Sequence, residues 1–283
     1  MPINDLLKIS FKKLTEELVE DLNGDNIKND ITSHLLMESS SKLRCVISNR
    51  EAIVPCGVIF IKNFLNNYFP ELNVKSLTED GKKLKKHSKI FLISGNAKII
   101  LAVERTILNF LQHLSSISTL TNKFIIKMNS NKTKLLDTRK TTIGLRKLEK
   151  YATKIGGAVN HRMGLFDEIL IKDNHIKTYG KIEKTLEKLN LKKLKNYKIE
   201  CDSFLQVKKC VEMGSKYILL DNMKPIEIKK CINLNKNNNI KFEITGGITF
   251  ENINKYSNLG ADFISTGKIT NSAKSVDIGL DII

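Results

Sequence analysis

Short apolar runs recur along the chain from about residue 133 onward, and each ends in a polar or glycine-containing tip. Helix-like stretches lie between several of these runs, with apolar residues at three- and four-residue spacing, as in 204–211 and 226–232. Strands that alternate with helices, with strand ends 20 to 35 residues apart, indicate parallel βαβ units. The six runs span residues 134–137, 168–172, 197–200, 217–221, 242–245 and 262–265.

The residues that suggest chemistry follow the ends of these predicted strands. A (β/α) barrel gathers its active site at the carboxyl ends of its strands, so a barrel fits the pattern better than an open sheet. About six strand-helix units are visible. The pattern therefore predicts an α/β fold with a C-terminal barrel, without securing a complete ring of eight strands.

The N-terminal part of the chain has a different pattern. Residues 9–22 form an amphipathic helix pattern, 42–48 and 90–94 are typical of strands, and 101–127 predict a long helix or helix pair leading into the barrel. We therefore expect a smaller α+β sandwich domain over residues 1–115, joined by the C-terminal tail 270–283, and a barrel domain over 116–269. The Asn- and Lys-rich stretch 233–241 is expected to be a surface loop.

Composition excludes several classes of protein. With 283 residues, 41% hydrophobic and 27% charged, the chain can bury a sizeable core, so disorder is not expected. No apolar run is long enough for a membrane span, and the N-terminus, with Asp5, lacks the pattern of a secretory signal, so a cytoplasmic protein is expected. The five cysteines are odd in number and scattered, which favours reduced structural thiols over disulfides or a zinc site.

The net charge of +17 raises the question of a nucleic-acid partner, because polyphosphate affinity is largely electrostatic. Only six of the 47 basic residues are arginines, however, and aromatic residues are sparse, so we interpret most of the charge as solvated lysine and expect no specific nucleic-acid binding. Arg105, Arg139 and Arg162 lie in polar clusters and indicate an anionic small ligand. Arg44, Arg50 and Arg146 could equally form surface or structural ion pairs.

Three basic clusters lie near the predicted strand ends. Asp137-Thr138-Arg139-Lys140-Thr141-Thr142 follows the first barrel strand, Asn160-His161-Arg162 precedes the next one, and Lys172-Asp173-Asn174-His175 ends it. Cations that converge on one barrel mouth would concentrate a multiply charged anion. His34, His87 and His113 have no such cluster around them and are expected to be structural or surface residues.

Carboxylates and glycine-rich segments end the remaining strands. Glu200 and Asp221 terminate successive strands, where they could hold Mg²⁺ or a sugar hydroxyl, stabilise a cationic transition state, or simply cap local structure. Thr245-Gly246-Gly247 and Thr266-Gly267-Lys268 end the last two strands, where barrels commonly bind phosphate through backbone N–H groups.

With these residues identified, the sequence resembles the quinolinate phosphoribosyltransferase family over essentially its whole length. The most specific similarity runs from Asp137-Thr-Arg-Lys-Thr-Thr142 through Glu149-Lys-Tyr-Ala152 and Asn160-His-Arg-Met-Gly-Leu165 to Ile171-Lys-Asp-Asn-His-Ile176. Supporting matches include Glu104-Arg-Thr-Ile-Leu-Asn109, Leu220-Asp-Asn222, Gly246-Gly-Ile-Thr249 and Ser265-Thr-Gly267.

The resemblance implies decarboxylating transfer of a phosphoribosyl group from phosphoribosyl pyrophosphate to quinolinate, with Mg²⁺ and no organic cofactor, in the de novo synthesis of NAD. It also implies a homodimer in which Arg105 reaches the partner's site. Lys140, Lys172, Glu200 and Asp221 would be catalytic, the two carboxylates lying near the ribose and the metal. The quinolinate pocket would contain Thr138, Arg139, Lys140, His161, Arg162 and Lys172, and the 5′-phosphate segments would be Thr245, Gly246, Gly247, Thr266, Gly267 and Lys268.

The sequence departs from the family pattern at a few positions. Ile143 replaces a usual proline, Lys198 an often acidic residue, Ala158 a glycine and Asn271 a histidine after the last phosphate loop. A related family of molybdenum-transport-associated proteins shares the fold and part of the Arg-Lys-Thr motif. It lacks the block Lys172-Asp-Asn-His-Ile176, which therefore favours the phosphoribosyltransferase over this alternative.

Overall fold

The computed structural model describes residues 2–236 and 239–283, which divide into two compact units. The first unit comprises Met1–Leu120, Lys147–Gly156 and Ala273–Ile283, and the second comprises Thr121–Arg146 and Gly157–Ser272. Each unit contains one sheet, and the helix α4 (Ala97–Met128) contributes residues to both units.

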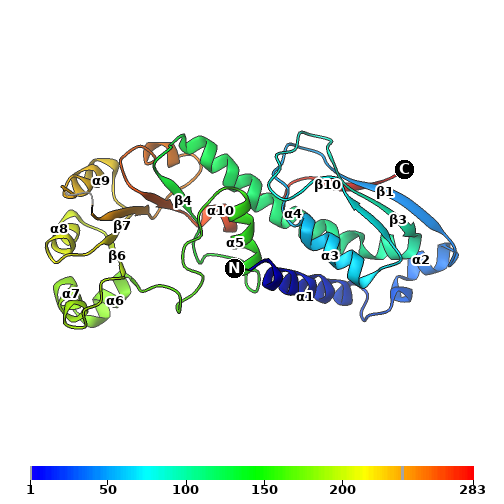
Figure 1. Cartoon of the computed structure of the whole chain (residues 1–283), viewed down its shortest axis with the longest axis horizontal. Helices are drawn as coiled ribbons and strands as arrows, with labels where there is room; N and C mark the ends of the chain where they lie inside the picture. The colour runs from blue at the N-terminus through cyan, green and yellow to red at the C-terminus, as the bar shows by residue number, and fades with distance from the viewer. Residues whose placement is uncertain (1, 237–238) are drawn as a thin grey trace. The chain divides into compact units, whose positions relative to one another are not determined.

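The first unit is built on an antiparallel sheet of four strands in the order β10-β1-β3-β2. Figure 1 labels β10, β1 and β3 of this sheet. The strand β10, near the C-terminus, pairs with β1, with Ser48 opposite Gly279. The strands of the sheet are β1 (Lys42–Asn49), β2 (Asn73–Ser76), β3 (Lys89–Asn96) and β10 (Ile278–Ile282). The helical elements of this unit are α1 (Ile3–Asp21), η1 (Ile27–Asn29), α2 (Ile31–Leu36), α3 (Val58–Tyr68) and α5 (Arg146–Ile155), whose first residue belongs to the second unit.

A single apolar core holds this unit together. The helix α1 buries Leu14 and Leu18, which lie four residues apart on one face, and α3 contributes Phe64. The inward residues of β1 and β3, among them Ile47 and Phe91, complete the core, and burial of such side chains contributes about 1.5–3 kcal/mol each. The helix α1 ends before Gly24, whose N–H donates to the carbonyl of Val19 in a left-handed turn.

The second unit contains a parallel sheet of six strands in the order β4-β9-β8-β7-β6-β5. Its strands are β4 (Lys134–Leu136), β5 (Leu170–Ile171), β6 (Lys198–Cys201), β7 (Tyr217–Asp221), β8 (Lys241–Thr245) and β9 (Phe263–Ser265). Among the described residues no ladder joins β4 to β5, but Val159 forms a parallel bridge with Leu136 beside β4. The helical elements are α6 (Asp173–Tyr179), α7 (Ile182–Leu191), α8 (Phe204–Glu212), α9 (Pro225–Ile232), η2 (Ile253–Lys255) and α10 (Lys268–Asn271).

The structure confirms the predicted class, with an antiparallel α+β unit and a parallel α/β unit whose six strands match the predicted runs. The segment 101–127 is part of one helix and not a pair. The segment 147–156 was assigned to the barrel on sequence but lies in the first unit. There the Tyr151 hydroxyl donates to Asp80 Oδ2 at 2.9 Å, and its ring packs against Phe60.

The remaining structural expectations concern the cysteines, the loop 233–241 and membrane spans. All five cysteines are buried and unpaired by disulfides, as expected. The stretch 233–241 connects α9 and β8, and its residues 237 and 238 lie outside the described part of the chain. Within the described residues, every helix is too short or too polar to cross a membrane.

Candidate active site

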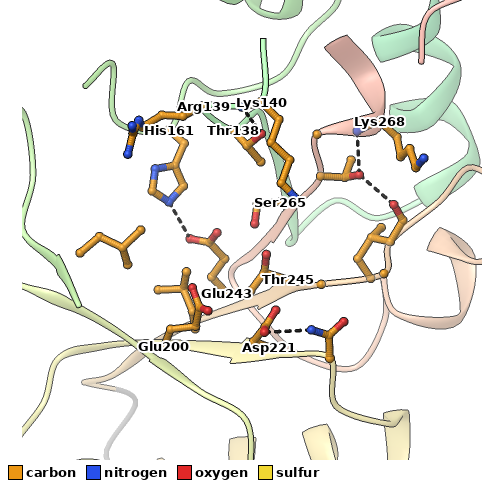
Figure 2. Close-up of a pocket in the computed structure, with 18 of the residues that line it drawn as sticks. Thr138, Arg139, Lys140, His161, Glu200, Asp221, Glu243, Thr245, Ser265 and Lys268 are labelled. Carbon is orange, nitrogen blue, oxygen red and sulfur yellow. Dashed lines mark hydrogen bonds and ion pairs between the residues drawn. The ribbon is translucent and has the colours of Figure 1, made fainter. Parts of the chain in front are cut away.

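A pocket of about 560 Å³ opens at the carboxyl ends of the parallel strands in the second unit (Figure 2). Parallel strands end at the same edge of a sheet, so residues far apart in sequence meet there. All the residues predicted for the barrel site line it, namely Thr138, Arg139, Lys140, His161, Arg162, Lys172, Glu200, Asp221, Thr245, Gly246, Gly247, Thr266, Gly267 and Lys268.

The loop after β4 is joined to the segment 160–162 by a buried carboxylate. Asp137 is fully buried, and its Oδ1 accepts from the His161 backbone N–H at 2.8 Å while Oδ2 accepts from Asn160 Nδ2 at 2.6 Å. The bridge between Val159 and Leu136 places this segment directly beside β4. Asp137 therefore positions His161 and Arg162 at the same mouth as Arg139.

Two guanidinium groups give this side of the pocket a positive field. Arg162 is 5% exposed and donates from Nη1 to the Glu168 carbonyl at 3.0 Å. Burial, followed by the nearby charge of Arg139, lowers the pKa of Arg162. Arg139 Nε is buried and has no hydrogen-bond partner within the described residues. A bound carboxylate or phosphate would relieve both the repulsion and the missing hydrogen bond.

A lysine and two carboxylates occupy the ends of β5, β6 and β7. Lys172 Nζ lies 3.2 Å from Glu200 Oε2. Burial raises the pKa of Glu200; the Lys172 ammonium counteracts this in part, while the charge of Asp221 adds to it. Asp221 Oδ2 in turn accepts from Asn222 Nδ2 at 2.9 Å. A cation or a set of hydroxyl donors between the carboxylates would reduce their mutual repulsion.

These carboxylates are suited to a hard divalent cation, which prefers oxygen ligands. No cluster of three or more His, Cys, Asp or Glu side chains with metal-binding geometry occurs in the described parts of the chain. Mg²⁺ commonly uses one or two carboxylates together with water and substrate phosphates. Glu200 and Asp221 therefore fit a metal that enters with a phosphorylated ligand.

Glycine-rich turns form the opposite wall of the pocket. Gly246 and Gly247 adopt φ values of 80° and 61°, in the left-handed region that favours glycine. The Thr266 hydroxyl donates to the Ile248 carbonyl at 2.8 Å and accepts from the Lys268 N–H at 3.1 Å. The two turns are thereby tied together, and glycine-rich turns of this kind suit an anionic ligand such as phosphate.

Arg105 is the one predicted site residue that the structure does not bring into this group. It lies on α4 in the first unit, is not among the pocket residues, and has a side chain that is 71% exposed. Its guanidinium lies 3.7 Å from the Glu104 carboxylate.

Arg50, Arg146 and His113, which were not assigned to the site, have structural partners. Arg50 pairs with Asp281 at 2.6 Å. Arg146 donates to Thr141 Oγ1 at 3.2 Å and to the Met163 carbonyl at 3.4 Å, so it braces two pocket loops. His113 Nε2 contacts Glu149 Oε1 at 3.0 Å within the first unit.

Sequence reasoning missed several pocket residues. Glu243 is fully buried in β8, where it stands between the buried apolar residues Phe242 and Ile244. A carboxylate in an apolar strand was the available signal, since buried acids almost always have a specific partner. The remaining missed residues are Leu170, Leu219, Asn222, Ile248, Thr249 and Ser265, and Asn271 also lines the pocket.

Comparison with known proteins gives one consistent result. The family models for the quinolinate phosphoribosyl transferase N-terminal and C-terminal domains match residues 30–115 and 117–281. A probable nicotinate-nucleotide pyrophosphorylase [carboxylating] of Methanocaldococcus jannaschii is 38% identical over 263 residues, covering 90% of this chain and 92% of the relative. The corresponding Bacillus subtilis protein is 35% identical, covering 89% and 88%.

Solved structures agree with the sequence relatives. The nicotinate-nucleotide pyrophosphorylase of Francisella tularensis superposes with a TM-score of 0.89 at 34% identity, covering 98% of this chain and 97% of that one. The Ehrlichia chaffeensis structure gives a TM-score of 0.88 at 35% identity, covering 100% and 99%.

Proposed function

Since the chain belongs to the quinolinate phosphoribosyltransferase family, we propose that its pocket joins quinolinate to phosphoribosyl pyrophosphate and releases CO₂. The protein is a pentosyltransferase of de novo NAD synthesis, and its relatives are named for the same reaction. The observation that carries the residue assignment is the meeting of cations, carboxylates and glycine-rich turns in one pocket.

Quinolinate is a dicarboxylate, so it requires cations at two places. Arg139, Arg162 and Lys172 supply guanidinium and ammonium groups, and Lys140 adds a further charge on the loop after β4. Thr138 and His161 complete this part of the pocket. Bidentate contacts to guanidinium groups would fix the orientation of the pyridine ring. Its nitrogen would then be held for attack on the ribose.

Phosphoribosyl pyrophosphate would occupy the other side of the pocket. The turns Thr245–Gly247 and Thr266–Lys268 line the pocket and suit its 5′-phosphate, because turns of this kind bind anions through backbone N–H groups. Glu200 and Asp221, which line the same pocket, would accept hydrogen bonds from the ribose hydroxyls. Mg²⁺ bound with the pyrophosphate would neutralise charge on the leaving group, and the two carboxylates would hold it from the protein side.

The chemistry requires little from the protein beyond position and charge. The pyridine nitrogen forms a bond to the ribose C1 as the C1–oxygen bond to pyrophosphate breaks, and Glu200 and Asp221 stabilise the positive charge that develops there. The positive pyridinium nitrogen then stabilises the carbanion left on the adjacent ring carbon when its carboxylate departs as CO₂, and that carbon takes a proton from solvent. Lys140 and Lys172 stabilise the anionic groups during these steps. No organic cofactor is required.

The direct test is release of labelled CO₂ from carboxyl-labelled quinolinate. We expect release only when both phosphoribosyl pyrophosphate and Mg²⁺ are present, with loss of activity in chelator and recovery on adding Mg²⁺. Arg139→Ala should abolish turnover without loss of folding, whereas Arg44→Ala, which removes an exposed arginine outside the pocket, should not. An active Arg139→Ala variant would refute the pocket assignment.

We also propose that the enzyme acts as a homodimer in which Arg105 completes the partner's quinolinate site. The support is the exposure of the Arg105 side chain and an exposed apolar surface on α2, where Ile31, Leu35 and Leu36 are 80%, 83% and 73% exposed.

Mixing inactive Arg105→Ala and Arg139→Ala chains tests this arrangement. Random reassortment gives heterodimers with one intact site, so activity should return to about a quarter of the wild-type value. If Arg105 served its own chain, every site in the mixture would remain defective and no activity would return.

A further inference from the structure

A buried carboxylate forms part of the pocket wall without any assigned role. Glu243 lies on β8 and is fully buried. Its Oε2 accepts from the Tyr217 hydroxyl at 2.8 Å and lies 3.5 Å from His161 Nε2 (Figure 2). A buried charge is costly unless it is paired, so these contacts account for its presence in an apolar strand.

Tyr217 is a fixed hydrogen-bond donor in this network. Its ring stacks on Phe263 with centroids 5.8 Å apart, and the Lys198 ammonium lies over the Tyr217 ring, 4.5 Å from its centroid. Burial, followed by the charge of Glu243, raises the pKa of Tyr217, so the phenol keeps its proton. The lysine at 198, a departure from the family pattern, therefore helps to hold Tyr217 in place.

Glu243 itself acts only as an acceptor. Its Oε2 accepts from the Tyr217 hydroxyl, and a carboxylate oxygen accepts hydrogen bonds. An ionised carboxylate has no proton to donate. The hydrogen between Glu243 and His161 must therefore reside on His161 Nε2.

The other ring nitrogen of His161 also has a hydrogen-bond partner within the protein. The Arg162 backbone N–H donates to His161 Nδ1 at 2.7 Å. A backbone N–H cannot accept a hydrogen bond, so Nδ1 carries no proton. The side chain is only 7% exposed, which leaves little room for water to replace either partner.

We propose that Glu243 is a positioning residue that holds His161 as a neutral imidazole with its proton on Nε2. Both ring nitrogens are then occupied by the protein, so His161 offers the substrate a fixed ring surface and no charge. The positive field for the dicarboxylate comes from Arg139, Arg162, Lys140 and Lys172. This inference rests on the proposed function in placing quinolinate beside His161.

Nitrogen-15 NMR of the histidine side chains tests the tautomer independently of activity. The intact protein should show a neutral imidazole protonated at Nε2 for His161 at pH 7.5, assigned by its absence in His161→Gln. A doubly protonated ring, or a proton on Nδ1, would overturn the proposal even if the enzyme turns over quinolinate. If the expected tautomer is found but quinolinate is not turned over, the proposed function is refuted and the positioning of His161 by Glu243 still stands.

Variants of Glu243 test the positioning role. Glu243→Leu removes both acceptor oxygens, so His161 loses the hydrogen bond that fixes its ring against the substrate. The KM for quinolinate should rise about tenfold, the size of one lost hydrogen bond that orders the ring, with the KM for phosphoribosyl pyrophosphate unchanged. Glu243→Gln retains an oxygen that can accept from Tyr217 and His161, so it should stay within about twofold of wild type. The control Glu212→Gln changes an exposed carboxylate on α8 and should have no effect.

The pattern across these variants separates positioning from stability. Equal KM values for quinolinate in Glu243→Leu and wild type would contradict the positioning role, and so would a tenfold loss in Glu243→Gln. If Glu243→Leu does not fold, Tyr217→Phe removes one donor to the same carboxylate, and the wild-type tautomer still decides the proposal.

Discussion

Replacement of Gly246 by alanine is expected to damage the site at the carboxylate opposite it. A Cβ on Gly246 would lie 2.5 Å from the side-chain oxygen of Asn222 and would also clash with Asp221 Oδ1. Ordinary contacts require about 3.5 Å, so these side chains must move by about 1 Å. The φ of 80° adds the cost of a left-handed conformation, about 1–2 kcal/mol for a residue with a Cβ.

The two costs can be separated with a matched glycine. Gly214 has a φ of 84° in the turn between α8 and β7, but a Cβ there would meet no atom within 4 Å. The backbone cost alone should lower the Tm of Gly214→Ala by about 2–8 °C, and Gly246→Ala should lose this and more because of the clash. Only Gly246→Ala should displace Asp221.

Steady-state kinetics with varied phosphoribosyl pyrophosphate provides the assay. A displacement of about 1 Å at a reacting group can cost about 100-fold, so kcat/KM should fall by about that factor in Gly246→Ala and remain near wild type in Gly214→Ala. Thermal melts of both variants check that the loss is not unfolding. If Gly246→Ala kept the activity of Gly214→Ala, the link between this glycine and the Asp221 geometry would be wrong.

Further predictions concern stability. Burial raises the pKa of Asp80, which accepts hydrogen bonds from Tyr151 and from a backbone N–H, so the folded state binds the Asp80 proton more tightly than the unfolded state. The free energy of unfolding of the wild type should therefore fall relative to that of Asp80→Asn as the pH rises from about 4 to 7. Urea titrations at several pH values measure this difference, and parallel pH profiles would contradict it. Ile278→Ala leaves a cavity at a buried site on β10 and should lower the free energy of unfolding by about 2–5 kcal/mol. Arg50→Ala breaks a partly exposed ion pair and should lower it by at most about 1 kcal/mol. Chemical denaturation that ranked the two variants oppositely would refute this account of the C-terminal strand. All five cysteines are buried, so a thiol reagent should titrate none in the folded protein and five in denaturant, and rapid reaction in the folded state would contradict their burial.

The linear pattern was sufficient for the elements and most of the site. Strands and helices alternate along the sequence, and parallel strands all end at the same edge of the sheet. Residues at those ends, such as Arg139, Glu200 and Gly246, could therefore be assigned to one pocket from the sequence alone. The side-chain types at those ends also indicated an anionic substrate.

Contacts between distant residues were decided only by the tertiary structure. Nothing in the sequence pairs Asp137 with the backbone of His161, places residues 147–156 in the first unit, or joins Tyr217, Glu243 and His161 in one hydrogen-bonded group. Periodicity reports which face of an element is buried, because the spacing of apolar residues follows the backbone repeat. It carries no information on which buried polar group will meet which partner, because hydrogen bonding depends on positions and angles that only packing fixes.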